Sequence, residues 1–169
     1  TPLFFDKNNP AVMFVSPVSG TVAAVNRGEK RKILSVVVTA DSAVSYEEFD
    51  VPKVSSAARG EIRDLLLKSG LWAMLIQRPY GIIASPADTP KSIFVSAFDS
   101  APLAPDYGFV LSGEGEALQK GFDVLAALTD GKVHLSYNAD CAEPEIKGVE
   151  LHAFKGKHPA GNVGVQIHH

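Results

Sequence analysis

Ile93-Phe94-Val95-Ser96-Ala97-Phe98 is a short, mostly apolar run, as expected for a strand that is covered on both faces of an α/β sheet. A helical pattern follows over residues 113–129. Val133–Tyr137 and Val149–Phe154 then have the β-branched and aromatic residues typical of strands. Strand, helix and strand at this spacing predict a parallel sheet with a right-handed crossover.

The start of that helix also suggests a cofactor loop. Ser112 is the expected helix cap, with Glu114 and Glu116 near the positive end of the helix and Gly131 at its stop. The run Ser-Gly-Glu-Gly-Glu over residues 112–116 partly matches a dinucleotide-binding loop. However, Leu118 occupies the third glycine position, and the two glutamates would repel a phosphate. We therefore interpret these residues as helix capping.

The first 50 residues have a different pattern. Strand-like runs at 12–15, 21–25 and 33–39 are separated by turn clusters, which predicts a small all-β unit. The pattern changes near Asp50, where we place a boundary between a β domain (1–50) and an α/β domain (51–169). In the second domain, Ile62, Leu65 and Leu66 have helical spacing, and Gly70 is placed to end that helix.

Composition excludes several classes of protein. The chain has 169 residues, of which 46% are hydrophobic, and its net charge of -3 argues against a nucleic-acid partner. A single cysteine, Cys141, excludes an internal disulfide and a cysteine-only metal cage, and favours a reducing compartment. The longest apolar runs, 70–76 and 33–38, are far shorter than the ~20 residues that a membrane-spanning helix needs.

The sequence offers no evident catalytic or metal-binding set. No pair among the five histidines has the His-x-x-x-His spacing of a zinc hydrolase, so we expect no metal site. Cys141 has acidic neighbours that disfavour a thiolate, which argues for a simple loop thiol. No serine lies in a Gly-x-Ser-x-Gly elbow. We expect no catalytic residue in this chain.

A basic cluster lies in the turn between two expected strands. Arg27, Lys30, Arg31 and Lys32 interrupt the strand pattern, with Glu29 among them. Two interpretations remain open. The cluster can orient an anionic partner surface or lipid headgroups, or it can be a solvated hairpin loop that Glu29 partly neutralises.

Several sequence segments resemble known families. Leu3-Phe4-Phe5-Asp6-Lys7, followed by residues 15–22 (Val-Ser-Pro-Val-Ser-Gly-Thr-Val), resembles the second half of a lipoyl/biotinyl domain, a flattened barrel-sandwich in which Lys7 would carry the modification. Three further segments resemble the A subunit of the bacterial sodium-translocating NADH:quinone oxidoreductases. They are residues 69–72 with Arg78-Pro79-Tyr80, residues 94–104, and His158-Pro159-Ala160-Gly161. The loop Asn26-Arg27-Gly28-Glu29-Lys30-Arg31 resembles that family as well.

The second resemblance covers nearly the whole chain in order. It implies an internal fragment with a lipoyl-like domain followed by a Rossmann-like α/β domain. It further implies a peripheral protein on the cytoplasmic face of the bacterial inner membrane, docked on the membrane-embedded B subunit at the quinone-reducing end of the complex. NADH, flavins, iron-sulfur centres and ubiquinone would lie in or near other subunits.

The resemblance also implies a fold similar to that of the flavin-binding, NADH-oxidising subunit of respiratory complex I and of the Rnf C subunit. Those proteins have a glycine-rich loop that this chain lacks. Residues 69–81 supply only Gly70 and Gly81, and Trp72, Met74 and Ile76 would obstruct a flavin phosphate. We therefore predict that the chain binds neither flavin mononucleotide nor NADH and holds no complete active site. Two alternatives remain: a carrier domain modified at Lys7, and a flavin-binding subunit of the complex I type.

Five residues are candidates for a quinone site or a subunit interface: Trp72, Arg78, Phe98, Asp99 and His158. Each also has a structural interpretation. Trp72 and Phe98 can belong to the core, Arg78 and Asp99 can pair with each other, and His158 before a proline can order a turn.

Overall fold

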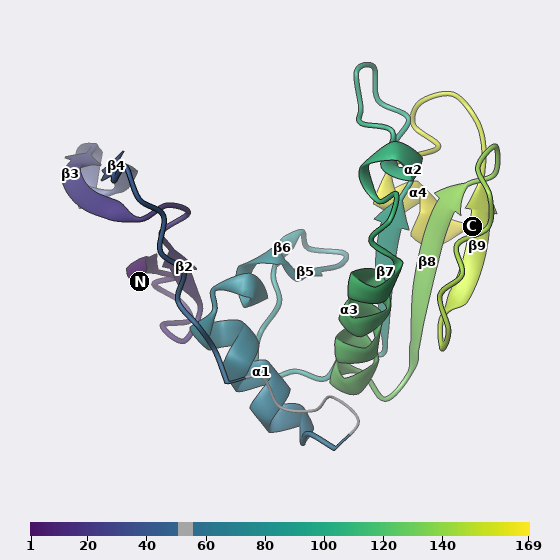
Figure 1. Ribbon diagram of the computed structural model, residues 1–169, viewed down its shortest axis with the longest axis horizontal. Helices are drawn as coiled ribbons and strands as arrows, with labels where there is room; N and C mark the ends of the chain where they lie inside the picture. The colour runs from purple at the N-terminus through teal and green to yellow at the C-terminus, as the bar shows by residue number, and fades with distance from the viewer. Residues whose placement is uncertain (51–55) are drawn as a thin grey trace. The chain divides into compact units, whose positions relative to one another are not determined.

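The computed structural model of the chain describes residues 1–50 and 56–169 (Figure 1). Its contacts define two compact units, Thr1–Pro52 with Arg63–Asp88, and Lys53–Ile62 with Thr89–His169. We call them unit 1 and unit 2. The predicted domain boundary between residues 50 and 51 adjoins residues 51–55, which lie outside the described residues, and it stays a prediction.

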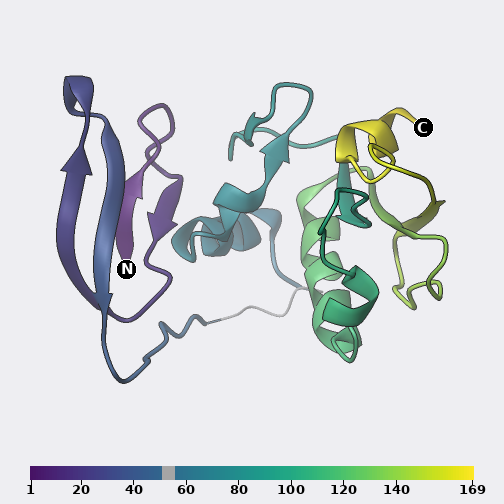
Figure 2. The same cartoon turned by 90° about the horizontal axis from the view of Figure 1, so that it is seen from above.

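Unit 1 is built from short antiparallel strand pairs. The pairs are β1 (Pro2–Phe5) with β2 (Met13–Val15), β3 (Gly20–Arg27) with β4 (Ile33–Ala40), and β5 (Ile76–Gln77) with β6 (Ile82–Ile83). Two 3-10 turns complete it, η1 (Glu29–Arg31) and η2 (Leu71–Met74). The long β3–β4 hairpin is the curved pair in purple and blue in Figure 2. None of these described sheets closes into a barrel.

The packing of unit 1 centres on β2 and η2. Val12 and Trp72 are almost fully buried, and the rings of Phe4 and Phe14 stack with their centroids 4.7 Å apart. Helix α1 (Arg59–Lys68) spans the division between the units, and Gly70 follows it in the left-handed conformation, as the sequence predicts. A Cβ on Gly70 would lie 2.8 Å from both Val15 methyl groups, so this close approach also requires glycine.

Unit 2 contains a parallel three-stranded sheet in the order β7-β8-β9. Its elements are β7 (Ser92–Ala97), α2 (Tyr107–Val110), α3 (Gly115–Leu128), β8 (Lys132–Asn138), β9 (Glu150–Phe154) and α4 (Val163–His168). Helix α3 connects β7 to β8 and packs along them (Figure 1). Both strand pairs of this sheet are parallel, which confirms the predicted parallel arrangement. The mixed α/β fold class is confirmed as well.

One face of this sheet forms the core of unit 2. Side chains alternate between faces along a strand, so Val133 and Leu135 share the face that α3 covers with Phe122. Phe94 lies on the other face and is 40% exposed. The prediction that this strand is covered on both faces is therefore wrong, because the described residues leave part of the second face open.

The predicted cap of helix α3 is also wrong. The helix begins at Gly115, three residues after Ser112, and Glu114 at the cap position makes no side-chain capping bond. The Ser112 amide instead donates to the Phe109 carbonyl (3.2 Å) and so closes the preceding turn, α2. Asp106 caps α2 by accepting from the Gly108 and Phe109 amides.

Candidate functional site

A candidate site lies at the carboxyl end of β7, where parallel sheets commonly bind ligands. The chain leaves the strand at Phe98, which is buried, and turns at Asp99, which is exposed. Asp99 Oδ1 accepts from the Ala101 amide at 2.8 Å, and this bond shapes the turn.

A second loop meets this turn through Gly161. The Gly161 amide donates to Ser100 Oγ (2.7 Å), and His158 Nδ1 lies 3.4 Å from the same oxygen. A Cβ on Gly161 would lie 2.1 Å from the Ser100 nitrogen, so only glycine allows this approach. The structure thus brings His158 together with Asp99 and Ser100, although they are about 60 residues apart in the sequence.

Helix α4 holds the same turn from inside unit 2. Gln166 is 7% exposed, and its Nε2 donates to the Phe98 carbonyl at 3.3 Å. Ser96 Oγ donates to that carbonyl as well, at 2.9 Å. Phe98 is therefore a core residue whose backbone fixes the turn. Asp99 and His158 are the side chains of this site that face solvent.

Trp72 and Arg78 belong to unit 1. Trp72 is 5% exposed, and its indole N–H donates to the Ala84 carbonyl at 2.7 Å, so its role in packing is clear. Arg78 is exposed in the turn between β5 and β6 and makes no ion pair with any residue in the described part of the chain. Of the side chains expected to block a cofactor loop, Trp72 is buried, whereas Met74 and Ile76 are 78% and 51% exposed.

Lys7 lies in the exposed turn between β1 and β2. The Asn8 amide donates to Asp6 Oδ1 (2.8 Å), and the Asp6 amide donates to the Val12 carbonyl (3.0 Å), which closes the loop. This position gives the Lys7 amine free access to solvent. Whether the amine is modified stays open.

The basic cluster forms the tip of the β3–β4 hairpin. Lys30 and Arg31 adopt positive φ angles of 53° and 62°, and Arg27 Nη1 donates to the Arg31 carbonyl at 3.1 Å. The charged side chains at the tip are therefore exposed and held by a defined turn. A solvated loop and an anionic docking surface both fit this geometry.

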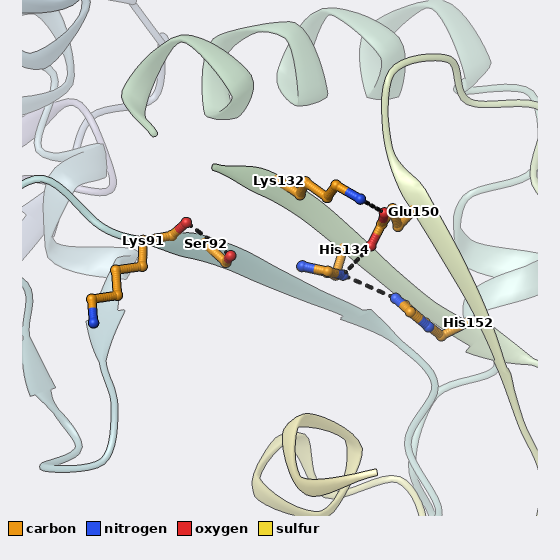
Figure 3. A network of polar contacts seen from close by, with 6 residues as sticks. All are labelled: Lys91, Ser92, Lys132, His134, Glu150 and His152. Atoms are coloured by element: carbon orange, nitrogen blue, oxygen red, sulfur yellow. Dashed lines mark hydrogen bonds and ion pairs between the residues drawn. The ribbon is translucent and has the colours of Figure 1, made fainter. Parts of the chain in front are cut away.

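Sequence reasoning misses a cluster on the open face of the unit 2 sheet (Figure 3). His134 on β8 faces Glu150 and His152 on β9, and His134 Nδ1 lies 3.0 Å from His152 Nε2. Spacing alone gives no signal, because residues 134 and 152 meet only through the parallel register of two strands. Lys132 pairs with Glu150 at the edge of this cluster.

Comparison with known proteins gives matches over both units. Residues 1–41 match the family described as the NqrA N-terminal barrel-sandwich hybrid domain, and residues 57–169 match the NqrA second alpha/beta domain. The chain is 40% identical over 170 positions to the A subunit of the Na(+)-translocating NADH-quinone reductase of Yersinia pseudotuberculosis serotype O:1b. The proteins of the same name from Saccharophagus degradans and Actinobacillus succinogenes are each 42% identical to it.

These matches cover 98% of this chain but only 38% of each relative. The two family matches follow one another along the chain in the order of the predicted β and α/β regions. On this evidence, the chain belongs to the NqrA family, the A subunits of the Na(+)-translocating NADH-quinone reductases.

Proposed function

We propose that this chain is part of a non-catalytic docking subunit of a sodium-translocating NADH:quinone oxidoreductase. The observation that carries the proposal is the ordered match of residues 1–41 and 57–169 to two NqrA domains, together with relatives about 40% identical over 98% of the chain. Those relatives are named as subunits of a Na(+)-translocating NADH-quinone reductase. The chain would support the quinone-reducing end of such a complex.

The proposed location is the cytoplasmic face of the bacterial inner membrane, with the membrane-embedded B subunit as the main partner and ubiquinone bound nearby. Unit 2 offers a surface suited to such a contact. After the Asp99 turn, Leu103 is fully exposed, and Phe109 and Val110 are 82% and 54% exposed. Large exposed apolar side chains of this kind are typical of protein interfaces. No helix in residues 1–50 and 56–169 is long and apolar enough to cross a membrane.

We also propose that the chain itself holds no flavin, NADH or iron-sulfur centre, and that other subunits carry them. The geometry of Gly70 supports this proposal. Its missing side chain makes room for Val15 and not for a cofactor phosphate, because an added Cβ would lie only 2.8 Å from each Val15 methyl group. The single cysteine, Cys141, cannot by itself hold an iron-sulfur cluster.

The proposal is tested with a tagged, full-length form of the protein, purified from detergent-solubilised membranes. We expect the other subunits to co-purify and the eluate to show sodium-stimulated NADH:quinone reduction. Leu103→Glu should weaken co-purification, because it places a charge in the proposed contact. Ala126→Glu is the matched control, since Ala126 is exposed on helix α3. A protein that elutes alone and without activity would refute the proposal.

A further inference from the structure

Three potential metal ligands meet on the face of the unit 2 sheet that α3 does not cover. The register pairs His134 with Glu150 and Ser136 with His152, so two adjacent strands present the three side chains next to each other. The nitrogen and oxygen atoms that these side chains offer all lie within 4.8 Å of one another. Figure 3 shows the two imidazole rings side by side, with the Glu150 carboxylate next to His134.

The distances within this cluster fit a tetrahedral metal ion. Four bonds of about 2.05 Å, as zinc forms with histidine nitrogen and carboxylate oxygen, place neighbouring ligand atoms about 3.3 Å apart. His134 Nδ1 lies 3.0 Å from His152 Nε2 and 3.3 Å from Glu150 Oε2. Both values are close to a tetrahedron edge, and the remaining pair, Glu150 and His152, lies within 4.8 Å, so a metal ion would draw these two side chains together.

The surroundings hold the three groups in place. The Phe94 ring stacks on the His134 ring with centroids 4.5 Å apart and planes 9° apart, which limits rotation of the imidazole. Lys132 binds Glu150 Oε1 and leaves Oε2 toward His134.

We propose that His134, Glu150 and His152 bind a divalent transition-metal ion of the zinc type, with a water molecule at the fourth position. Two imidazoles and one carboxylate are a common zinc ligand set, whereas magnesium and calcium prefer oxygen ligands alone. The ion would link β8 to β9 through their side chains. This proposal does not depend on the docking role of the family.

The test is a calorimetric titration of the full chain, produced without a histidine tag and freed of metal with EDTA, using Zn²⁺ as the probe. We expect one Zn²⁺ per chain. Cobalt(II) should then give the strong visible absorption of a four-coordinate site. Zn²⁺ binding that never reaches one equivalent, or Co²⁺ that keeps the weak spectrum of six-coordinate cobalt, would overturn the proposal and leave a hydrogen-bonded network without metal.

Single variants locate the site. His152→Gln and His134→Gln should each weaken Zn²⁺ binding by at least about 100-fold, because each removes a direct ligand, and even the loss of an outer partner costs about 10- to 100-fold. Glu150→Gln, which keeps the shape of the side chain, serves as the second test if a histidine variant folds poorly. Circular dichroism in EDTA checks the fold of each variant.

The matched control addresses the other neighbouring histidines of the chain. His168 and His169 have ring centroids 5.4 Å apart at the end of α4 and can bind metal adventitiously. The double variant His168→Gln with His169→Gln should keep the full Zn²⁺ affinity. If this double variant loses binding while His134→Gln and His152→Gln retain it, the proposed site is wrong.

Discussion

Gly161→Ala tests the packing that builds the candidate site at the end of β7. Gly161 is buried, and an added Cβ would lie 2.1 Å from the Ser100 nitrogen and 2.6 and 2.7 Å from the Asp99 carbonyl carbon and Cα. All three are backbone atoms, which no side-chain rotation can move. The two loops must therefore separate by about 1.4 Å, since a carbon and a nitrogen in ordinary contact lie about 3.5 Å apart.

The free-energy cost of this separation can be estimated from three contributions. Overpacking a buried site typically costs about 1–3 kcal/mol, and three backbone contacts place this one at the upper end. Loss of the 2.7 Å hydrogen bond from the Gly161 amide to Ser100 Oγ adds about 1 kcal/mol. Alanine also reduces the conformational entropy of the unfolded chain, which offsets about 0.4–1 kcal/mol of this destabilisation. We expect a net destabilisation of about 3 kcal/mol, and a Tm lowered by about 10 °C or more for a unit of this size.

Gly121→Ala is the matched control for this substitution. Gly121 lies inside helix α3, and nothing lies within 4 Å of the position that its Cβ would take. Alanine should therefore stabilise the helix by about 0.5–1 kcal/mol. Urea and thermal unfolding followed by circular dichroism measure both variants. Equal stability of Gly161→Ala and the parent chain would refute the close approach of the two loops.

Three further predictions concern single side chains. Leu135→Ala should lower the free energy of unfolding, measured by urea denaturation, by about 2–5 kcal/mol, because Leu135 is 4% exposed. Leu103→Ala is the control: Leu103 is fully exposed, so the same free energy should change by less than about 0.5 kcal/mol. Trp72→Phe should cost about 1–3 kcal/mol by the same assay, since the Ala84 carbonyl loses its indole donor; an unchanged midpoint would contradict this. Lys132→Met should weaken Zn²⁺ binding several-fold in calorimetry, because Lys132 binds Glu150 Oε1 and so holds Oε2 toward His134. Stronger binding would instead mean that the positive charge of Lys132 opposes the ion more than it positions Glu150.

The sequence predicts the regular part of unit 2 well. The runs at 93–98, 133–137 and 149–154 match β7, β8 and β9 to within one residue at each end, because β-branched and aromatic residues concentrate in strands. The hairpin of β5 and β6 is not predictable in this way, since strands of two residues show no alternation. Helix α4 escapes prediction as well, because six residues with an internal glycine give no helical periodicity.

The candidate sites depend on long-range contacts and so escape sequence reasoning to different degrees. The resemblance singles out Phe98, Asp99 and His158, and the structure brings these three together, yet nothing in their spacing predicts the contact. The same resemblance names Trp72 and Arg78, which lie in the other unit. The cluster of His134 with His152 depends on which strands are neighbours and on their parallel register, and the spacing of the two histidines along the chain does not show either.

The motif His158-Pro159-Ala160-Gly161 therefore combines a structural and a functional element that can be separated. Gly161 is explained by sterics alone, since its Cβ would collide with the backbone of the neighbouring turn. His158 is exposed, and its contact with Ser100 is long at 3.4 Å, so packing does not require an imidazole there. A functional role for this loop must consequently rest on His158 and Asp99, which face solvent at the carboxyl edge of the sheet, and not on the glycine that positions them.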